Sequence, residues 1–169
     1  ISRAVFKGLP LVSRIVTVTG DCVKEPRNVR APLGVSYREV IEFCGGLTQE
    51  PKKLVSGGPM MGQAQWDMDA PVTKGTSALL AFSAEYDSIN TRHSACIHCG
   101  MCVSHCPMHL MPNYLTQYAQ QRRYDDAEKL NVMSCVECGT CSYNCPAGVE
   151  IVQYIRVAKG AIRAKKIKR

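Results

Sequence analysis

The chain has 169 residues, which is enough for one medium domain or two small ones. Its formal charge is +7, and no apolar run approaches the ~20 residues that a bilayer span requires. This composition excludes an integral membrane protein and predicts a soluble or peripheral one. The first residue is Ile1 rather than methionine, so we expect a piece of a longer polypeptide.

Residues 1–83 have the pattern of a small α+β domain. Ser36 and Glu39 form a capping box that begins a helix, and the glycine pair at 45–46 ends it. Short runs rich in apolar and β-branched residues indicate strands. These runs cover residues 4–6, 11–19, 29–32, 53–56 and 76–82.

A glycine-rich loop at 57–62 and two isolated cysteines are the remaining features of this half. The loop spacing matches neither phosphate-binding fingerprint, and no capped helix follows it, so a structural turn is the simpler interpretation. Cys22 and Cys44 match no ligand motif and are expected to be buried thiols.

The other eight cysteines repeat one motif, C-x2-C-x2-C-x3-C-P, which is the bacterial ferredoxin pattern for 4Fe-4S ligation. Three cysteines at short intervals let one loop cover one side of a four-iron cube, and the fourth ligand must come from elsewhere. The first copy contains Cys96, Cys99, Cys102 and Cys106, and the second contains Cys135, Cys138, Cys141 and Cys145.

The fourth cysteine of each motif precedes a proline, which suits the first turn of a helix that leads away. We therefore expect Cys106 and Cys145 each to reach the cluster of the other motif, as in two-cluster ferredoxins. The prediction assigns cluster one to Cys96, Cys99, Cys102 and Cys145, and cluster two to Cys135, Cys138, Cys141 and Cys106.

Two other uses of the cysteines are disfavoured. Zinc sites use separated C-x2-C pairs, so a third cysteine at the same interval would be surplus. Disulfide frameworks are typical of small secreted proteins, whereas these cysteines form ligand triplets. Two oxidised clusters of about −2 each would also lower the net charge to about +3, which weakens a nucleic-acid interpretation.

Helices are expected around the motifs, over residues 112–121, 124–130 and 149–167, in a cluster region that begins near Tyr86. The chain has four histidines, His93, His98, His105 and His109. Of these, His98 and His105 could donate N–H hydrogen bonds that tune the reduction potential of a cluster. The last helix carries a basic face that leads into the tail at 165–169. This face is either a solvated surface or a docking surface for an acidic partner or anionic lipid. It comprises Arg156, Lys159, Arg163 and Lys166.

The chain resembles the C subunit of the Rnf ion-translocating oxidoreductase complex over essentially its whole length. The resemblance rests on both cysteine motifs, the loop at 57–62, the run Val72-Thr73-Lys74-Gly75-Thr76, and the segments 145–147 and 151–156. It implies the C-terminal portion of that protein. The implied fold is α+β, with a β-grasp (SLBB-like) domain at 1–83 and a helical two-cluster ferredoxin-type domain at 84–169.

This resemblance implies electron transfer in a membrane-associated NADH:ferredoxin oxidoreductase that moves sodium ions or protons. FMN and NADH would bind only to a preceding domain that is missing here. The implied partners are the other Rnf subunits, with ferredoxin and NADH serving the whole complex and no nucleic acid. The implied location is peripheral, on the cytoplasmic face of a bacterial inner membrane.

Two rival interpretations stay open at this point. The cobalamin reductase of propanediol-utilising microcompartments looks similar across both domains. Alternatively, the first domain binds a ligand or partner and the clusters are structural. No catalytic residue is assigned, because no acid–base pair or nucleophilic constellation stands out beside the cysteines.

Overall fold

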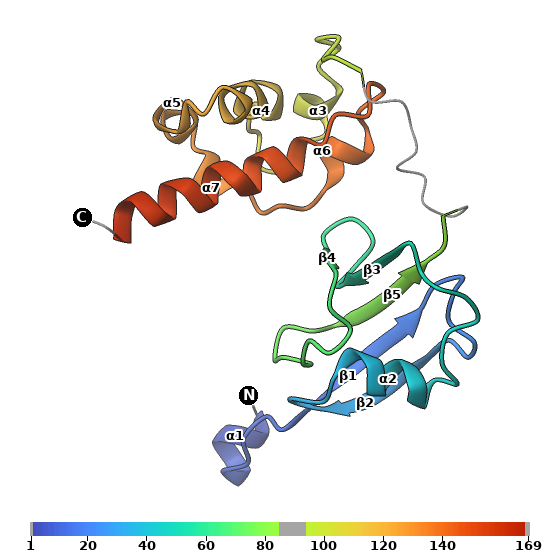
Figure 1. The fold of residues 1–169 in the computed structure, drawn as a ribbon. Coiled ribbons are helices and arrows are strands. Elements are labelled where there is room, and N and C mark those ends of the chain that lie inside the picture. Colours follow the sequence, from blue (N-terminus) through green and yellow to red (C-terminus); the bar gives the residue numbers. More distant parts are fainter. Residues whose placement is uncertain (1, 85–93, 168–169) are drawn as a thin grey trace. The chain divides into compact units, whose positions relative to one another are not determined.

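The computed structural model describes residues 2–84 and 94–167. They belong to two compact units, Ile1–Ser88 and Ile89–Arg169 (Figure 1). The expected boundary between residues 83 and 84 stays a prediction, because the adjoining stretch 85–93, with Tyr86 and His93, lies outside the described residues. Within the described ranges, no helix has both the length and the apolar character needed to cross a membrane.

The first unit is a mixed five-stranded sheet, which confirms the α+β class. The strands follow the order β2-β1-β5-β3-β4. Strand β1 runs parallel to β5, and the other neighbouring pairs are antiparallel. The bounds are β1 Ser13–Thr19, β2 Arg27–Pro32, β3 Lys53–Ser56, β4 Gln63–Gln65 and β5 Ala78–Phe82.

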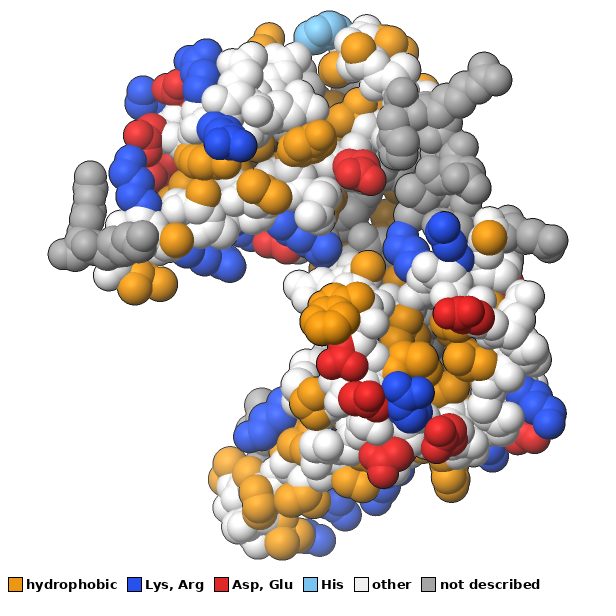
Figure 2. All heavy atoms as spheres, viewed as in Figure 1, with side chains coloured by type: hydrophobic (Ala, Val, Ile, Leu, Met, Phe, Trp, Pro, Cys, Tyr) orange, Lys and Arg blue, Asp and Glu red, His pale blue; other side chains and the backbone are white. Residues whose placement is uncertain are grey.

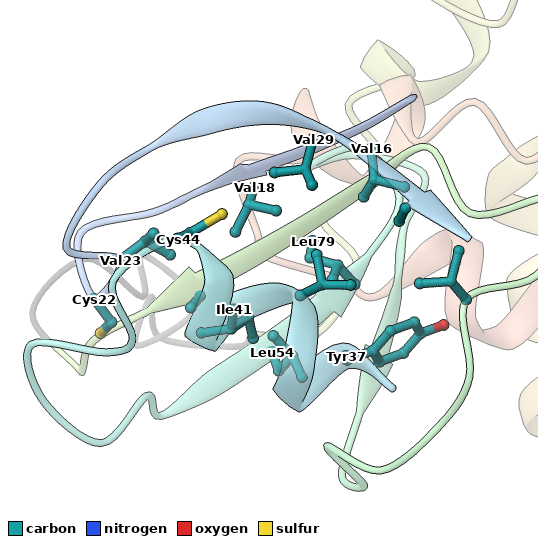
Figure 3. Packing of buried hydrophobic residues seen from close by; sticks show 14 residues of the cluster. Val16, Val18, Cys22, Val23, Val29, Tyr37, Ile41, Cys44, Leu54 and Leu79 are labelled. Carbon is teal, nitrogen blue, oxygen red and sulfur yellow. The ribbon is translucent and has the colours of Figure 1, made fainter. Parts of the chain in front are cut away.

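Helix α2 (Tyr37–Phe43) covers one face of this sheet. Alternation along β1 buries Val16 and Val18, and these side chains meet Ile41 and Tyr37 of α2 in the core (Figure 3). The capping box is present, because both the side chain of Ser36 and its backbone are bonded to the third helical residue. Both isolated cysteines, Cys22 and Cys44, are fully buried, as predicted.

Two elements differ from the sequence prediction. Residues 4–6 form part of a helix, α1 (Ser2–Lys7), rather than a strand. Its Val5 and Phe6 are exposed. No strand in residues 2–84 and 94–167 pairs with this segment, so its backbone bonds locally instead. Strand β4 was not predicted because it is polar. It forms because the glycine loop at 57–62 folds it back onto β3, where Val55 pairs with Ala64.

The second unit consists of helices around the two cysteine motifs. The three predicted helices are α4 (Pro112–Gln120), α5 (Tyr124–Lys129) and α7 (Ile151–Ile167). Helix α4 packs along α7, and Leu115 and Ile155 are fully buried between them. Three short elements were not predicted: α3 (Met101–Ser104), α6 (Thr140–Tyr143) and the 3-10 turn η2 (Val132–Ser134). Each of the two short helices follows a left-handed glycine.

The prediction that Lys159 belongs to an exposed basic face of α7 is wrong, because this residue is only 6% exposed. Lys159 lies three or four positions from buried Ile155 and Ile162, so the helical repeat turns it inward. Nearer the C-terminus, Lys165 and Lys166 pair with carboxylates of α5. Figure 2 shows basic and acidic side chains interleaved at this end of the unit. The last two tail residues, 168–169, lie outside the described residues.

Candidate iron–sulfur centres

Each cysteine triplet sits in a loop with two left-handed residues. In the first loop these are His98 (φ +55°) and Gly100 (φ +78°). In the second they are Glu137 (φ +56°) and Gly139 (φ +84°). Left-handed backbone reverses the chain over a few residues. The loop can therefore bring three closely spaced thiols to one centre.

The fourth cysteines, Cys106 and Cys145, do not lie in the first turn of a helix as expected. Each occupies a turn, and left-handed residues three positions later delay the next helix until Pro112 and Ile151. A backbone N–H four residues on donates to each sulfur at 3.4 Å, from Leu110 in the first motif and Val149 in the second. These bonds orient both sulfurs in the same way relative to the chain.

Two cavities gather the eight cysteines in two groups of four. One cavity of about 430 Å³ is lined by Cys96, Cys99, Cys102 and Cys145. A narrower one of about 20 Å³ is lined by Cys135, Cys138, Cys141 and Cys106. Each group thus joins the triplet of one motif to the fourth cysteine of the other, in the combinations that the sequence predicts.

The donor chemistry and arrangement suit four-iron clusters. A cube presents a different iron to each thiolate, so its four ligands surround a volume rather than meeting at one point. In residues 2–84 and 94–167, no three His, Cys, Asp or Glu side chains converge as ligands of a single ion. The first cavity provides such a volume, and the second is lined by the other four cysteines in a tighter space.

Burial raises the pKa of several of these thiols in the cluster-free chain. It raises the pKa of Cys141 to about 12, with a further contribution from the charge of Cys135. Burial also raises the pKa of Cys102 and of Cys135, although backbone N–H groups of Asn113 and Glu137 oppose it. Iron binds thiolates, so cluster assembly must displace these protons.

A charged network beside the second loop was missed by the sequence interpretation. Glu137 accepts from Arg156 Nε at 3.0 Å and from Lys159 Nζ at 2.5 Å. Lys159 Nζ also donates to the carbonyl oxygen of Cys135 at 2.9 Å. Burial acts to raise the pKa of Glu137, but the bonds from both cations outweigh it and hold the pKa below its usual value.

Of the two histidines expected near the clusters, His98 lines the first cavity. His105, which is exposed as His98 is, has its Nδ1 2.9 Å from the carbonyl oxygen of Met101. A tuning role through the ring is therefore open to His98, which lines the first cavity. His105 instead stays engaged with the short helix α3.

Comparisons with known proteins place both units in described families. Residues 15–64 match the SLBB domain, and residues 92–149 match the 4Fe-4S dicluster domain. The fold and site thus define a protein that joins an SLBB sheet domain to a two-cluster ferredoxin-type domain.

Similar proteins extend this match over nearly the whole chain. The C subunit of the Na(+)-translocating ferredoxin:NAD(+) oxidoreductase complex of Acetobacterium woodii is 49% identical over 99% of the chain. The C subunit of the proton-translocating ferredoxin:NAD(+) oxidoreductase complex of Clostridium ljungdahlii is 48% identical over 97%. The C subunit of the ion-translocating oxidoreductase complex of Rhodobacter capsulatus is 43% identical over 94%.

The chain belongs to the family of C subunits of the ion-translocating, Rnf-type oxidoreductase complexes. It spans only part of these relatives, namely 38%, 36% and 30% of their lengths in the same order.

Proposed function

We propose that this chain carries electrons between two 4Fe-4S clusters as part of an ion-translocating NADH:ferredoxin oxidoreductase. Cluster one is held by Cys96, Cys99, Cys102 and Cys145, and cluster two by Cys135, Cys138, Cys141 and Cys106. Bound clusters of this type supply one-electron transfer. The chain itself contributes the thiolates and orients them through tight loops that lie beside α4 and α7.

The grouping of the cysteines into two cavities carries this proposal. Each cavity receives three sulfurs from one motif and one from the other. Such crossing ties both centres to both motifs, so the two clusters are held at a fixed separation by one small fold. A fixed short separation is what stepwise electron transfer through a protein needs.

The first cluster is the one that we expect to exchange electrons with a partner. The third cysteine of each triplet is buried, but Cys96 and Cys99 are exposed, whereas their counterparts Cys135 and Cys138 are partly covered. Ile97, between these two ligands, is 62% exposed and extends an apolar surface around the site. A partner could therefore approach this loop closely and exclude water from it.

At the level of the whole complex, we further propose that NADH and FMN bind to a domain outside this chain. Ferredoxin and the other subunits would then be the partners of the complex, attached peripherally on the cytoplasmic side of the membrane. The names of the relatives support the subunit assignment and the two electron carriers, ferredoxin and NAD(+). Those names specify different coupling ions, so the proposal leaves the ion open. We also propose that the boundary between the two domains lies between residues 83 and 84.

Iron and sulfide analysis of anaerobically purified protein tests the proposal directly. About eight irons and eight sulfides per chain are expected for two cubanes. Reversible reduction followed by EPR should then show two centres that accept one electron each. Stoichiometric zinc in place of iron, or clusters that cannot be reduced and reoxidised, would contradict an electron-transfer role.

A further inference from the structure

The internal repeat allows each part of one cluster site to be compared with its counterpart. Residues 39 positions apart correspond, as Cys96 and Cys135 do. The counterpart bonds from Leu110 to Cys106 and from Val149 to Cys145 have the same length, 3.4 Å. The backbone at His98 and Glu137 is left-handed in the same way. The two sites are therefore built on one plan.

The plan differs in how each loop is fastened to the helix beside it. In the second site, Lys159 and Arg156 of α7 both bind Glu137, which lies between the first two ligands of the loop. The counterparts in the first site are Gln120, Gln117 and His98. All three line the wide first cavity. In the described part of the chain, no hydrogen bond joins these three side chains.

Lys159 occupies the central place in this network. Its ammonium group is almost entirely removed from solvent, and burial of a charge is tolerated only when hydrogen-bonded partners compensate it. One of its bonds goes to the backbone of a ligand residue, the carbonyl of Cys135, and another to the side chain of Glu137. The lysine thus joins α7 to the loop at two points, one of which is the backbone of a proposed ligand residue.

We propose that Lys159, acting with Glu137 and Arg156, is a positioning residue that fastens the second cysteine loop to α7. The second cluster is thereby retained under conditions that remove the first cluster. The helix beside the first loop has neutral glutamines at the positions that correspond to Arg156 and Lys159. The same network places a cationic group beside the second cluster and so contributes to the difference between the two reduction potentials. This inference rests on the proposed binding of two 4Fe-4S clusters.

Cluster loss can be measured by adding an excess of an iron(II) chelator to the anaerobic 169-residue chain in excess dithionite, which reduces the remaining iron(III) as the clusters come apart. Each transferred iron leaves its thiolate and sulfide ligands for the chelator, so absorbance of the iron–chelator complex reports the rate. The wild-type chain should release its iron in two phases, with the first cluster emptied first. EPR at intermediate times identifies the surviving signal as that of the second cluster.

Lys159→Gln introduces the residue found at the corresponding position of the first site. It should speed the slow phase of iron release by about 10–100-fold, which is the usual size of effect when a residue that hydrogen-bonds a metal ligand is removed. It should also move the reduction potential of the second cluster to more negative values, because a positive charge beside the cluster is lost. The first cluster should keep its potential.

Lys166→Gln is the matched control. It makes the same substitution on the same helix at an exposed lysine that pairs with Glu128 of α5, and it should change neither rate nor potential. Lys159→Arg keeps the positive charge, so the reduction potential of the second cluster should stay near the wild-type value. This should hold even if the larger arginine side chain fits less well and loosens the loop. A simply structural lysine would not produce this separation of rate from potential.

Far-UV circular dichroism shows whether each variant folds. Should Lys159→Gln fail to fold, Glu137→Gln tests the same contact while keeping the shape of the side chain, and it should also speed the slow phase. A wild-type chain with about eight irons, but unchanged slow-phase rates and potentials in the folded variants, would overturn the inference. A wild-type chain that binds no iron would instead refute the proposed function.

Discussion

The two cysteine loops share a motif and a backbone path, yet they present their thiols differently. Left-handed residues stand at corresponding positions, His98 in the first loop and Glu137 in the second. The first loop leaves Cys96 exposed beside a wide cavity, whereas its counterpart Cys135 is partly covered. The neighbouring helix makes this difference. Helix α4 offers glutamines to its loop, and α7 offers two cations that bind Glu137.

A ligand motif therefore specifies which thiols can meet, but the surrounding helices decide how exposed and how firmly held the site is. Outer contacts of this kind are known to alter metal affinity and redox potential without changing a single ligand. Duplication of a motif thus leaves room for two centres with unequal roles. In this chain the open site is suited to exchange with a partner, and the fastened site is suited to internal transfer.

The largest expected effect comes from breaking the crossed ligation itself. Cys145→Ser should remove the first cluster and lower the iron content from about eight to about four per chain. The mirror variant Cys106→Ser should remove the second. Cys99→Ser identifies the EPR signal of the first cluster, because Cys99 belongs to the first triplet under either ligation scheme. Loss of the opposite signal in Cys145→Ser would show that each motif binds its own cluster.

A smaller effect is expected from transplanting the fastening network into the first site. The triple variant His98→Glu, Gln117→Arg and Gln120→Lys gives the first loop the side chains of the second. It should slow chelator removal of the first cluster by up to about tenfold, since added outer contacts restrain the loop. The rate for the second cluster is the internal control. An unchanged first rate would show that the loops differ for another reason.

The smallest effect concerns the shared backbone of the loops. At Gly100, where φ is +78°, an added Cβ would meet no atom within 4 Å, so Gly100→Ala costs only backbone strain. That strain is about 1–2 kcal/mol of unfolding free energy. Gly139→Ala, at φ +84°, should cost at least as much. Denaturant unfolding of the cluster-loaded chain measures both. A negligible cost at Gly100 together with the expected cost at Gly139 would show that the first loop relaxes where the second does not.

Much of the fold was accessible from local patterns. Alternating apolar residues located β1, and the capping box located the start of α2 at Ser36. Strand β4 was missed because its glutamines carry no strand signal, and its pairing with β3 depends on the hairpin. The prediction of a strand at residues 4–6 was wrong, because a high β-propensity favours a strand only where a neighbouring strand packs against the segment.

The candidate sites show the same division. Spacing alone proposed two sets of four cysteines, and the cavities bring the same sets together, with Cys145 beside the first triplet and Cys106 beside the second. Lys159 escaped detection because a lysine on an amphipathic helix is ordinarily solvated. Its inward position becomes visible only when the partner carboxylate, 22 residues earlier in the chain, is placed against it.

By itself, the sequence determined the class of chemistry, because short fixed intervals between cysteines limit which thiols can share a cluster. It also determined the elements whose hydrophobic period is strong. Only the tertiary structure decided which loop is open and which is fastened, and that Lys159 is buried rather than solvated. Exposure and ion pairing depend on residues distant in the chain, and only the packing of α4 and α7 around the loops fixes where those residues lie.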